Sequence, residues 1–422
     1  MQRNNLEPSE VPAAARRDLA SQRRLVTANA LSALGDGVRF AALPLLAAAV
    51  SEGDPVAVSL VAAAGRAAWL LAPVIGTLVD RMPRRRAMIG ADLARCAGLV
   101  LLCTAIAAAG TVPVAAIGAV AFISGVAEVF FDSAAQAVVP SLAPSEDLER
   151  LNARLIAMQT IGAGFVGPPA GAALWAVWHP LPFLLNATTF LASALVLFGL
   201  VERVPRAGQT SEGHRLTVGA VLRDTWAGLR LLGQNLTLRR LVLIVAVLGI
   251  AQQMVYGILV VYVTGPLGLP ASGYGWMLTA AAVGSLAGAK AGPWAAARLG
   301  TRRSLLVSIA LSAASYLCIA AFPLWPVVAL MLVVNGAGVV LWNICTVSLR
   351  QRLVPLEMLG RVTSGYRLAA WGVMPIGSVL GGRLADGSWS GAPWAVAGTL
   401  LLLSLTLIFT MQVEPERRSE DE

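Results

Sequence analysis

The sequence has few charged residues for its length. Asp, Glu, Lys and Arg make up 13% of the 422 residues, whereas about 25% is usual for a soluble domain. Hydrophobic residues make up 57%, and they fall into blocks of roughly 20, the length at which a helix crosses a hydrocarbon core about 30 Å thick. The shortage of charge therefore excludes an ordinary soluble protein. It predicts an all-α, multi-pass protein of the cell membrane.

Residues that ligate metals or carry out covalent chemistry are also scarce. The chain has two histidines and four cysteines. The cysteines lie inside apolar blocks without the spacing of a metal site. Neither a phosphate-binding Gly-Lys-Ser/Thr loop nor a nucleophile elbow occurs. We therefore expect no enzyme activity, no metal, no cofactor and no direct use of ATP.

The basic residues follow the membrane topology, although a net charge of +9 could suggest a nucleic-acid partner. Arginines lie in the gaps after the even-numbered apolar blocks, as Arg150, Arg203 and Arg350 illustrate. The positive-inside rule explains this placement and puts both termini in the cytoplasm. We expect the lipid bilayer, protons and a small molecule as partners, with no nucleic acid, and the protein as a monomer.

Charges, prolines and glycines divide the chain into twelve predicted membrane spans in two bundles of six. The first bundle is predicted at 25–50, 55–79, 87–109, 112–136, 152–178 and 181–201. The second is predicted at 239–264, 272–297, 304–322, 325–349, 361–384 and 391–412. The predicted domains are a cytoplasmic tail (1–24), the first bundle (25–203), a cytoplasmic linker with an interfacial helix (204–238), the second bundle (239–412) and a cytoplasmic tail (413–422).

A short charged loop between the second and third spans has a faint copy in the second half. The sequence "DRMPRRR" at 80–86 aligns with "ARLGTRR" at 297–303. Such duplication is typical of transporters built from two parallel repeats. The loop resembles that of the major facilitator superfamily, with Pro83 at the place of one glycine. The residues that match its pattern are Gly76, Leu78, Asp80, Arg81, Arg84 and Arg85.

Two further segments resemble one subgroup of that superfamily. They are "LRDTWAGLRLLGQNLTLRRLVLI" at the junction of the bundles and "PLEMLGRVTSGYRLAAWGVMPIGSVLGG" at 355–382. Both are similar to drug and proton antiporters, a subgroup that includes macrolide efflux proteins and the enterobactin exporter. Gly167, Pro168 and Gly171 resemble part of an element associated with antiport, in which Ala172 replaces the last glycine. The resemblance implies a major facilitator fold and export.

The loop motif is expected to form a cytoplasmic gate. Asp80 at a helix end can pair with Arg81, Arg84 or Arg85 and with the positive end of a neighbouring helix. The alternative is that the arginines only fix the topology. Asp132 either completes this gate, as in related transporters, or lies in water at the membrane interface.

Several ionisable residues fall deep inside predicted spans, where charge is costly and a functional role is the first expectation. Asp36, Arg66 and Glu128 reach similar depth, so we predict a charge cluster that couples transport to protons, with Asp36 the first candidate carrier and Glu128 the second. A permanent ion pair with Arg66 is the structural alternative. Asp92 and Arg95 are three residues apart and are expected to satisfy each other.

The substrate cavity is expected to combine aromatic walls with a few polar anchors. In the first span, spacing places Asn29, Ser32, Asp36 and Arg39 on one helical face. The predicted cavity residues are Asn29, Ser32, Arg39, Phe40, Gln252, Tyr256, Asn335, Trp342, Asn343, Arg367 and Trp371.

These features together predict a secondary transporter that works by alternating access. It is expected to export a small amphipathic compound, such as a drug, antibiotic, siderophore or metabolite, in exchange for protons. Two alternatives remain open: proton symport for uptake, and a membrane receptor or lipid-remodelling protein that transports nothing.

Overall fold

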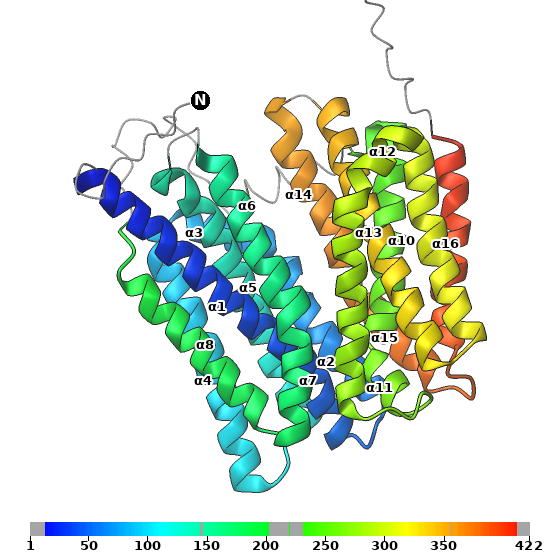
Figure 1. The fold of residues 1–422 in the computed structure, drawn as a ribbon, viewed down its shortest axis with the longest axis horizontal. Coiled ribbons are helices and arrows are strands. Elements are labelled where there is room, and N and C mark those ends of the chain that lie inside the picture. Colours follow the sequence, from blue (N-terminus) through cyan, green and yellow to red (C-terminus); the bar gives the residue numbers. More distant parts are fainter. Residues whose placement is uncertain are drawn as a thin grey trace, which may run out of the picture. The chain divides into compact units, whose positions relative to one another are not determined.

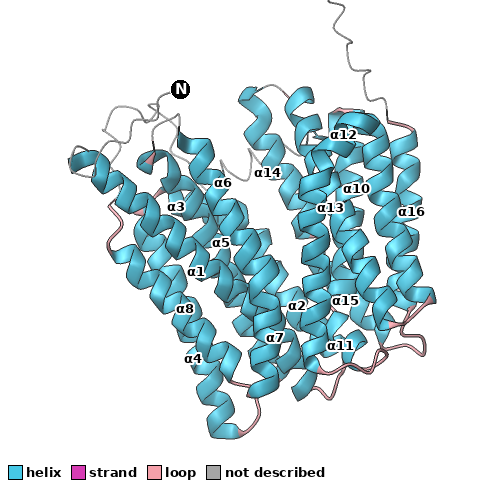
Figure 2. Ribbon diagram, in the orientation of Figure 1, coloured by secondary structure: helices cyan, strands magenta, loops and turns pink. Residues whose placement is uncertain are grey.

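The computed structural model describes residues 13–143, 147–201, 219, 230, 232–354 and 356–411. These residues are helical apart from turns and short loops, and no strand occurs among them (Figure 1, Figure 2). Most of the predicted linker 204–238, with its interfacial helix, and the whole tail 413–422 lie outside these ranges. Residues 13–24, expected in the N-terminal tail, are already helical.

Local sequence signals explain where several helices begin and end. The Asp54 side chain accepts a hydrogen bond from the Val56 backbone N–H at 2.8 Å, which caps helix α2 (Pro55–Ala67) and satisfies one otherwise unpaired N–H group. Helix α4 (Arg84–Ala109) ends at Gly110, whose φ of 73° is left-handed and suits glycine. Proline, acid and glycine therefore separate the apolar blocks as the sequence predicts.

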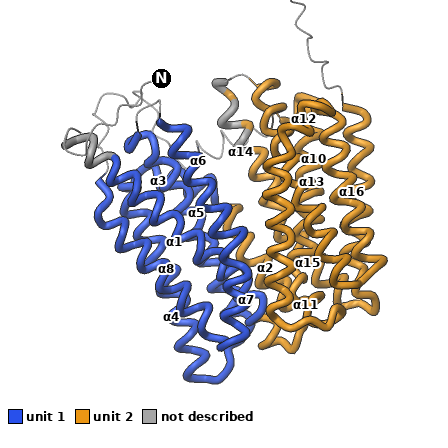
Figure 3. The backbone as a smooth tube through the Cα atoms, viewed as in Figure 1, with its two compact units in different colours: residues 1–46, 71–221 blue, residues 47–70, 222–422 orange. Residues whose placement is uncertain are grey.

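The helices gather into two compact units, which Figure 3 shows in different colours. Unit 1 comprises residues 1–46 and 71–221, and unit 2 comprises residues 47–70 and 222–422. In unit 1, α4 packs against α5 and α8. The remaining helices of unit 1 are α1 (Ala13–Val50, as far as Leu46), α3 (Ala72–Asp80), α5 (Val114–Leu142), α6 (Leu148–Gln159), α7 (Gly167–Val177) and α8 (Leu181–Phe198).

In unit 2, α12 packs against α13 and α16, and α10 packs against α15 and α16. Glycine makes the first of these contacts possible, because a Cβ atom on Gly284 would overlap the backbone of Val333. Besides α2, the helices of unit 2 are α10 (Leu236–Tyr256), α11 (Leu259–Thr264), α12 (Ala271–Ala321), α13 (Trp325–Leu353), α14 (Leu356–Gly372), α15 (Met374–Ala385) and α16 (Ala392–Phe409).

Helix α2 belongs to unit 2, although the sequence places it in the first six-span bundle, 25–203. It packs along α15, and the contact is so close that a Cβ on Gly382 would overlap the Ser59 side chain. Sequence order and hydropathy carry no information about such a contact, because it joins residues more than 300 positions apart. The domain boundaries drawn from the sequence thus remain a prediction of folding units.

Eleven segments of the described chain are long and apolar enough to cross a membrane. One of them, α12, covers both 272–297 and 304–322, which the sequence predicts as separate spans. Within it, Gly300 has φ 73° and ψ 164°, which are not helical values, so two helical segments meet there. The remaining segments fall on the predicted spans, with ends shifted by several residues.

Candidate functional site

Buried charges meet at the centre of unit 1. Asp36 on α1 accepts hydrogen bonds from two guanidinium groups, at 2.8 Å from Arg95 Nη1 and 3.3 Å from Arg39 Nη2. Arg39 also reaches Glu128 Oε2 on α5 at 2.6 Å. The side chains of Asp36, Arg39 and Glu128 are only 10–22% exposed. Asp36 and Glu128, the two acids predicted as proton carriers, are therefore joined through one arginine.

Arg95 on α4 is the most deeply buried member of this group. Its Nη2 donates to Asp92 Oδ1 at 2.6 Å and to Ser32 Oγ at 2.9 Å. The side chain is 0% exposed, and its guanidinium lies 4.3 Å from the ring centroid of Phe190, which adds a cation–π contact. Carboxylates on two sides and aromatic rings around it compensate Arg95 for its lost hydration.

Asp132 lies one helical turn beyond Glu128 on α5 and differs from the other acids. It accepts one hydrogen bond, from Gln159 Nε2 at the end of α6, at 3.0 Å. Among the described residues it forms no ion pair. We call Asp36, Arg39, Asp92, Arg95, Glu128 and Asp132 the acid cluster.

Sequence reasoning found part of this cluster. The pairing of Asp92 with Arg95 is present, but Arg95 also holds Asp36, a role that spacing along one helix could not indicate. Gln159 was missed as well, and its only signal was an amide within the predicted span 152–178. Arg66 lies in α2, in unit 2, and its predicted place beside Asp36 and Glu128 stays a prediction.

The gate residues lie at the junction of α3 and α4. Gly76 and Asp80 are in α3, Arg81 follows its last residue, and Arg84 and Arg85 begin α4. Arg85 Nη1 donates to the Leu200 carbonyl at 3.2 Å, beyond the end of α8. Asp80 is exposed and forms no ion pair with a described residue. A gate formed by these residues, with or without Asp132, stays a prediction.

The glycines of the antiport-like element hold α7 against α1. A Cβ on Gly167 would lie 2.6 Å from the Cα of Gly37, and one on Gly171 would lie 2.6 Å from the Val38 carbonyl oxygen. Pro168 stands between them near the start of α7. Just before α7, residues Thr160–Val166 form a π-helical segment, a feature that often marks functional positions. These glycines thus pack the helices directly beside Asp36.

The predicted cavity residues are divided between the units. In unit 1, Asn29 Nδ2 donates to the Leu155 carbonyl at 3.1 Å, Ser32 and Arg39 join the acid cluster, and Phe40 follows on the same helix. In unit 2, Asn335 and Trp342 are each 1% exposed. The other predicted residues of unit 2 are Gln252 and Tyr256 on α10, Asn343 on α13, and Arg367 and Trp371 on α14.

Trp371 and Arg367 are engaged inside unit 2. Trp371 makes an edge contact with Trp69, with ring centroids 4.3 Å apart, and the Arg367 guanidinium lies 5.5 Å from the Trp371 ring. Close side-chain packing is what the structure shows for these residues, and their contact with a substrate stays a prediction.

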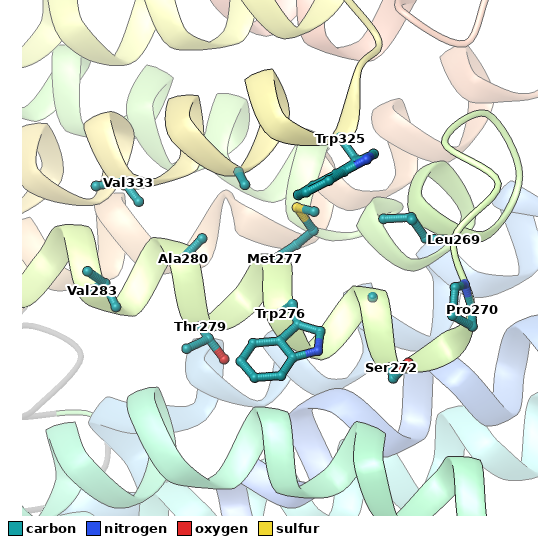
Figure 4. Close-up of a pocket in the computed structure, with 12 residues that line it drawn as sticks. Leu269, Pro270, Ser272, Trp276, Met277, Thr279, Ala280, Val283, Trp325 and Val333 are labelled. Atoms are coloured by element: carbon teal, nitrogen blue, oxygen red, sulfur yellow. The ribbon is translucent and has the colours of Figure 1, made fainter.

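An apolar pocket of about 610 Å³ lies along the first turns of α12 and α13 in unit 2. Figure 4 shows Trp325 and Trp276 on opposite sides of Met277. The two tryptophans are 56% and 68% exposed. The polar side chains of the lining are those of Ser272 and Thr279, and Thr279 already donates to the Gly275 carbonyl. Sequence reasoning did not indicate this pocket.

Among the described residues, no group of three or more His, Cys, Asp or Glu side chains could hold a metal ion.

Comparison with known proteins gives these features a context. Residues 18–422 match the family described as transmembrane secretion effector. Macrolide efflux protein A of Enterococcus faecalis is 32% identical over 173 residues, which cover 41% of this chain and 51% of that protein. The match thus spans about half of that relative's length. Multidrug efflux pump Tap of Mycolicibacterium fortuitum is 26% identical over 392 residues, which cover 89% of this chain and 92% of that protein.

Solved transporter structures share the fold. A bacterial homologue of the iron transporter ferroportin, in an inward-facing state, has a TM-score of 0.70 at 17% identity, over 93% of this chain and 98% of that one. The nucleoside transporter NupG has a TM-score of 0.73 at 13% identity, over 92% and 97% of the two chains. The family match extends over nearly the whole sequence, and so this multi-pass membrane protein belongs to the transmembrane secretion effectors of the major facilitator superfamily.

Proposed function

We propose that the protein exports a small amphipathic compound from the cell in exchange for protons. It does so by alternating access of two six-helix bundles, with twelve spans, both termini in the cytoplasm and a monomer as the working unit. The relatives from Enterococcus faecalis and Mycolicibacterium fortuitum are efflux proteins, which favours export.

The acid cluster is the observation that carries the proton part of the proposal. Four carboxylates and two guanidinium groups lie together on membrane-spanning helices of unit 1. A charge at mid-membrane costs at least about 2.5 kcal/mol even on insertion scales. A cluster of this cost therefore indicates a function for its charged side chains. Carboxylates that exchange arginine partners or water also change their proton affinity, which is the property that coupling requires.

The remaining predicted residues have supporting roles in this scheme. The gate at Asp80, Arg81, Arg84 and Arg85 closes the cytoplasmic side, and the close packing at Gly167 and Gly171 transmits movement of α7 to α1. The cargo needs aromatic and apolar walls, for which Phe40, Tyr256 and the pocket beside Trp276 are candidates.

Proton symport for uptake is the second candidate, because the fold is shared with the nucleoside transporter NupG and a fold does not fix the direction of transport. Liposomes with an acidic lumen distinguish the two. If added erythromycin raises the luminal pH more than it does in protein-free liposomes, transport is antiport. If the lumen becomes more acidic, it is symport.

A drug and metabolite susceptibility panel tests export itself. Cells that produce the protein should tolerate at least one amphipathic toxic compound better than cells that produce the Asp36→Asn variant. A protein that moves no compound in the panel, in cells or in liposomes at any gradient, would instead support a receptor or lipid-remodelling role.

A further inference from the structure

We propose that Asp132, and not Asp36 or Glu128, binds the proton that is exchanged during transport, with Gln159 as the group that senses it. This inference rests on the proposed function, because it names the proton site within the same acid cluster. It also gives Asp132 a role other than the two that the sequence suggests, which are a place in the cytoplasmic gate and a place in water at the membrane interface.

The charges of the cluster do not balance when every acid is ionised. Its carboxylates are those of Asp36, Asp92, Glu128 and Asp132, whereas the guanidinium groups that contact them among the described residues of unit 1 are those of Arg39 and Arg95. Excess negative charge is unfavourable inside a membrane-spanning bundle. The cluster is therefore expected to retain at least one proton under ordinary conditions.

Ion pairing indicates which acid holds that proton. Asp36 contacts both arginines, Asp92 contacts Arg95 at 2.6 Å, and Glu128 contacts Arg39 at 2.6 Å. A guanidinium in contact favours the ionised carboxylate. Within the described chain, Asp132 has no such contact, so it loses least when it is protonated.

The charged groups around Asp132 reinforce this assignment. Glu128 on the same helix and Asp36 on α1 both repel its negative charge, and Arg95 on α4 is the cation that opposes them. Arg95 is already shared by Asp36 and Asp92. Glu128 is four residues away on the same helical face, where like charges are unfavourable.

The other helices packed against α5 add little charge near Asp132. Helix α3 contributes Asp80, which is exposed at its last residue. Helix α6 contributes Glu149, Arg150 and Arg154, and all three are exposed. Asp132 itself is partly accessible, whereas Asp92 is 0% exposed. Water can therefore reach Asp132 more readily than it can reach Asp92.

Gln159 is suited to report the state of Asp132. An amide both donates and accepts hydrogen bonds, so it can bind a carboxylate through its N–H and a carboxylic acid through its carbonyl oxygen as well. Gln159 is the last residue of α6, directly before the π-helical segment Thr160–Val166. Loss or gain of the proton at Asp132 can thus change the hydrogen bonding of Gln159 directly beside the π-helical segment.

That π-helical segment continues the path to Asp36. A Cβ on Gly162 would lie 2.8 Å from the backbone nitrogen of Leu34, and one on Gly37 would lie 2.9 Å from the Cα of Ala163. The segment therefore packs closely on α1 at Leu34 and at Gly37, which lie before and after Asp36 in the sequence. Proton binding at Asp132 can thereby shift α1 and the Asp36 contacts to Arg39 and Arg95.

Infrared difference spectroscopy of the purified full-length protein tests the site without any cargo. The C=O stretch of a protonated carboxylic acid is followed between pH 5 and pH 9. The wild-type protein should show a band that disappears as the pH rises. Asp132→Asn should lack this band, whereas Glu128→Gln and Asp36→Asn should retain one. Asp147→Asn is the matched control, because Asp147 is an exposed acid at the start of α6.

A titrating band that persists in Asp132→Asn and is lost in Asp36→Asn or Glu128→Gln would overturn the proposal, and so would the absence of any titrating band. If Asp132→Asn does not fold, a protein that carries Asp36→Asn, Asp92→Asn and Glu128→Gln and is labelled with carbon-13 aspartate replaces it. The titrating band must then persist and shift with the label, and a lost or unshifted band would contradict the assignment.

This readout separates two kinds of failure. A titrating Asp132 in a protein whose liposomes show no proton exchange would contradict antiport alone. Normal antiport in an Asp132→Asn protein would contradict the Asp132 assignment alone. Gln159→Leu tests the sensing role. If this variant retains the band but the pH at which half of the band is lost differs from that of the wild type, the result supports the role. An unchanged midpoint pH contradicts it.

Discussion

The two units treat buried charge in different ways. In unit 1, Arg39 and Arg95 are paired with carboxylates at 2.6–3.3 Å. In unit 2, no ion pair occurs among the described residues, and Arg350 is 8% exposed. Its guanidinium packs 3.7 Å from the ring centroid of Tyr366, and its Nε donates to the Thr346 carbonyl at 3.2 Å.

This difference in buried charge suggests different roles for the two units. Groups that can take up protons within a helical span are concentrated in unit 1, whereas unit 2 relies on aromatic rings, backbone carbonyls and close glycine contacts. An arginine that packs over an aromatic ring at a helix C-terminus can be buried without a carboxylate partner. The ring and the last carbonyl groups of the helix partly compensate its charge for the lost hydration. We infer that proton coupling depends on unit 1 and that unit 2 mainly supplies shape.

The largest expected effect is on stability when an arginine of each unit is replaced. Arg95→Gln leaves Asp36 and Asp92 buried without their cation, which should cost about 3–5 kcal/mol. Arg350→Gln leaves no carboxylate without its cation and should lower the free energy of unfolding by about 0.5–2 kcal/mol, the range of a cation–π contact. Thermal unfolding of the purified proteins in detergent measures both, and equal losses would contradict the comparison.

Glycine packing in unit 2 should give the next largest effect. Gly284→Ala places a methyl group against the backbone of Val333 and should cost about 1–3 kcal/mol, as overpacked sites do. Gly98→Ala on α4 is the matched control, because nothing lies within 4 Å of the position that its new methyl group would take. If both variants unfold at the same temperature as the wild type, the close contact of α12 and α13 does not depend on the absence of a side chain at Gly284.

The Arg39 and Glu128 contact should be energetically coupled by roughly 1 kcal/mol, within the range for contacting pairs. A double-mutant cycle with Arg39→Gln, Glu128→Gln and the double variant measures the coupling through thermal unfolding. Additive effects would show that the pair at 2.6 Å does not act as a unit.

The smallest effect on stability is expected at the pocket of unit 2. Trp276 is 68% exposed, so Trp276→Leu should change stability by no more than about 0.5 kcal/mol. Its loss should weaken binding of an amphipathic compound that uses the pocket, because one aromatic wall is removed. Erythromycin binding by calorimetry checks this, and the exposed Trp389→Leu serves as control. Unchanged affinity at Trp276 would exclude the pocket as a site for that compound.

Much of the fold follows from the sequence, because hydropathy marks each span and Asp54, Gly110 and Asn235 mark helix ends. The superfamily was predicted from the motif that runs from Gly76 to Arg85. The place of α2 could not be predicted, since it depends on the packing of α2 along α15, which joins residues far apart in the sequence. In the site, depth along a helix identified Asp36 and Glu128. The partner of each acid depends on how helices rotate against one another, so the contact of Arg95 with Asp36 could not be predicted. The predicted place of Arg66 beside these acids stays a prediction.

Binding of cargo and loss of protons from unit 1 are expected to be linked. Erythromycin, adjusted to the pH of a weakly buffered solution of the purified protein, should release protons on mixing, because linkage makes the coupling reciprocal. Arg350→Gln should release protons like the wild type, whereas a protein with Asp36→Asn, Glu128→Gln and Asp132→Asn should release none. Binding of erythromycin to the wild type without any proton release, or equal proton release from the triple variant, would contradict this linkage.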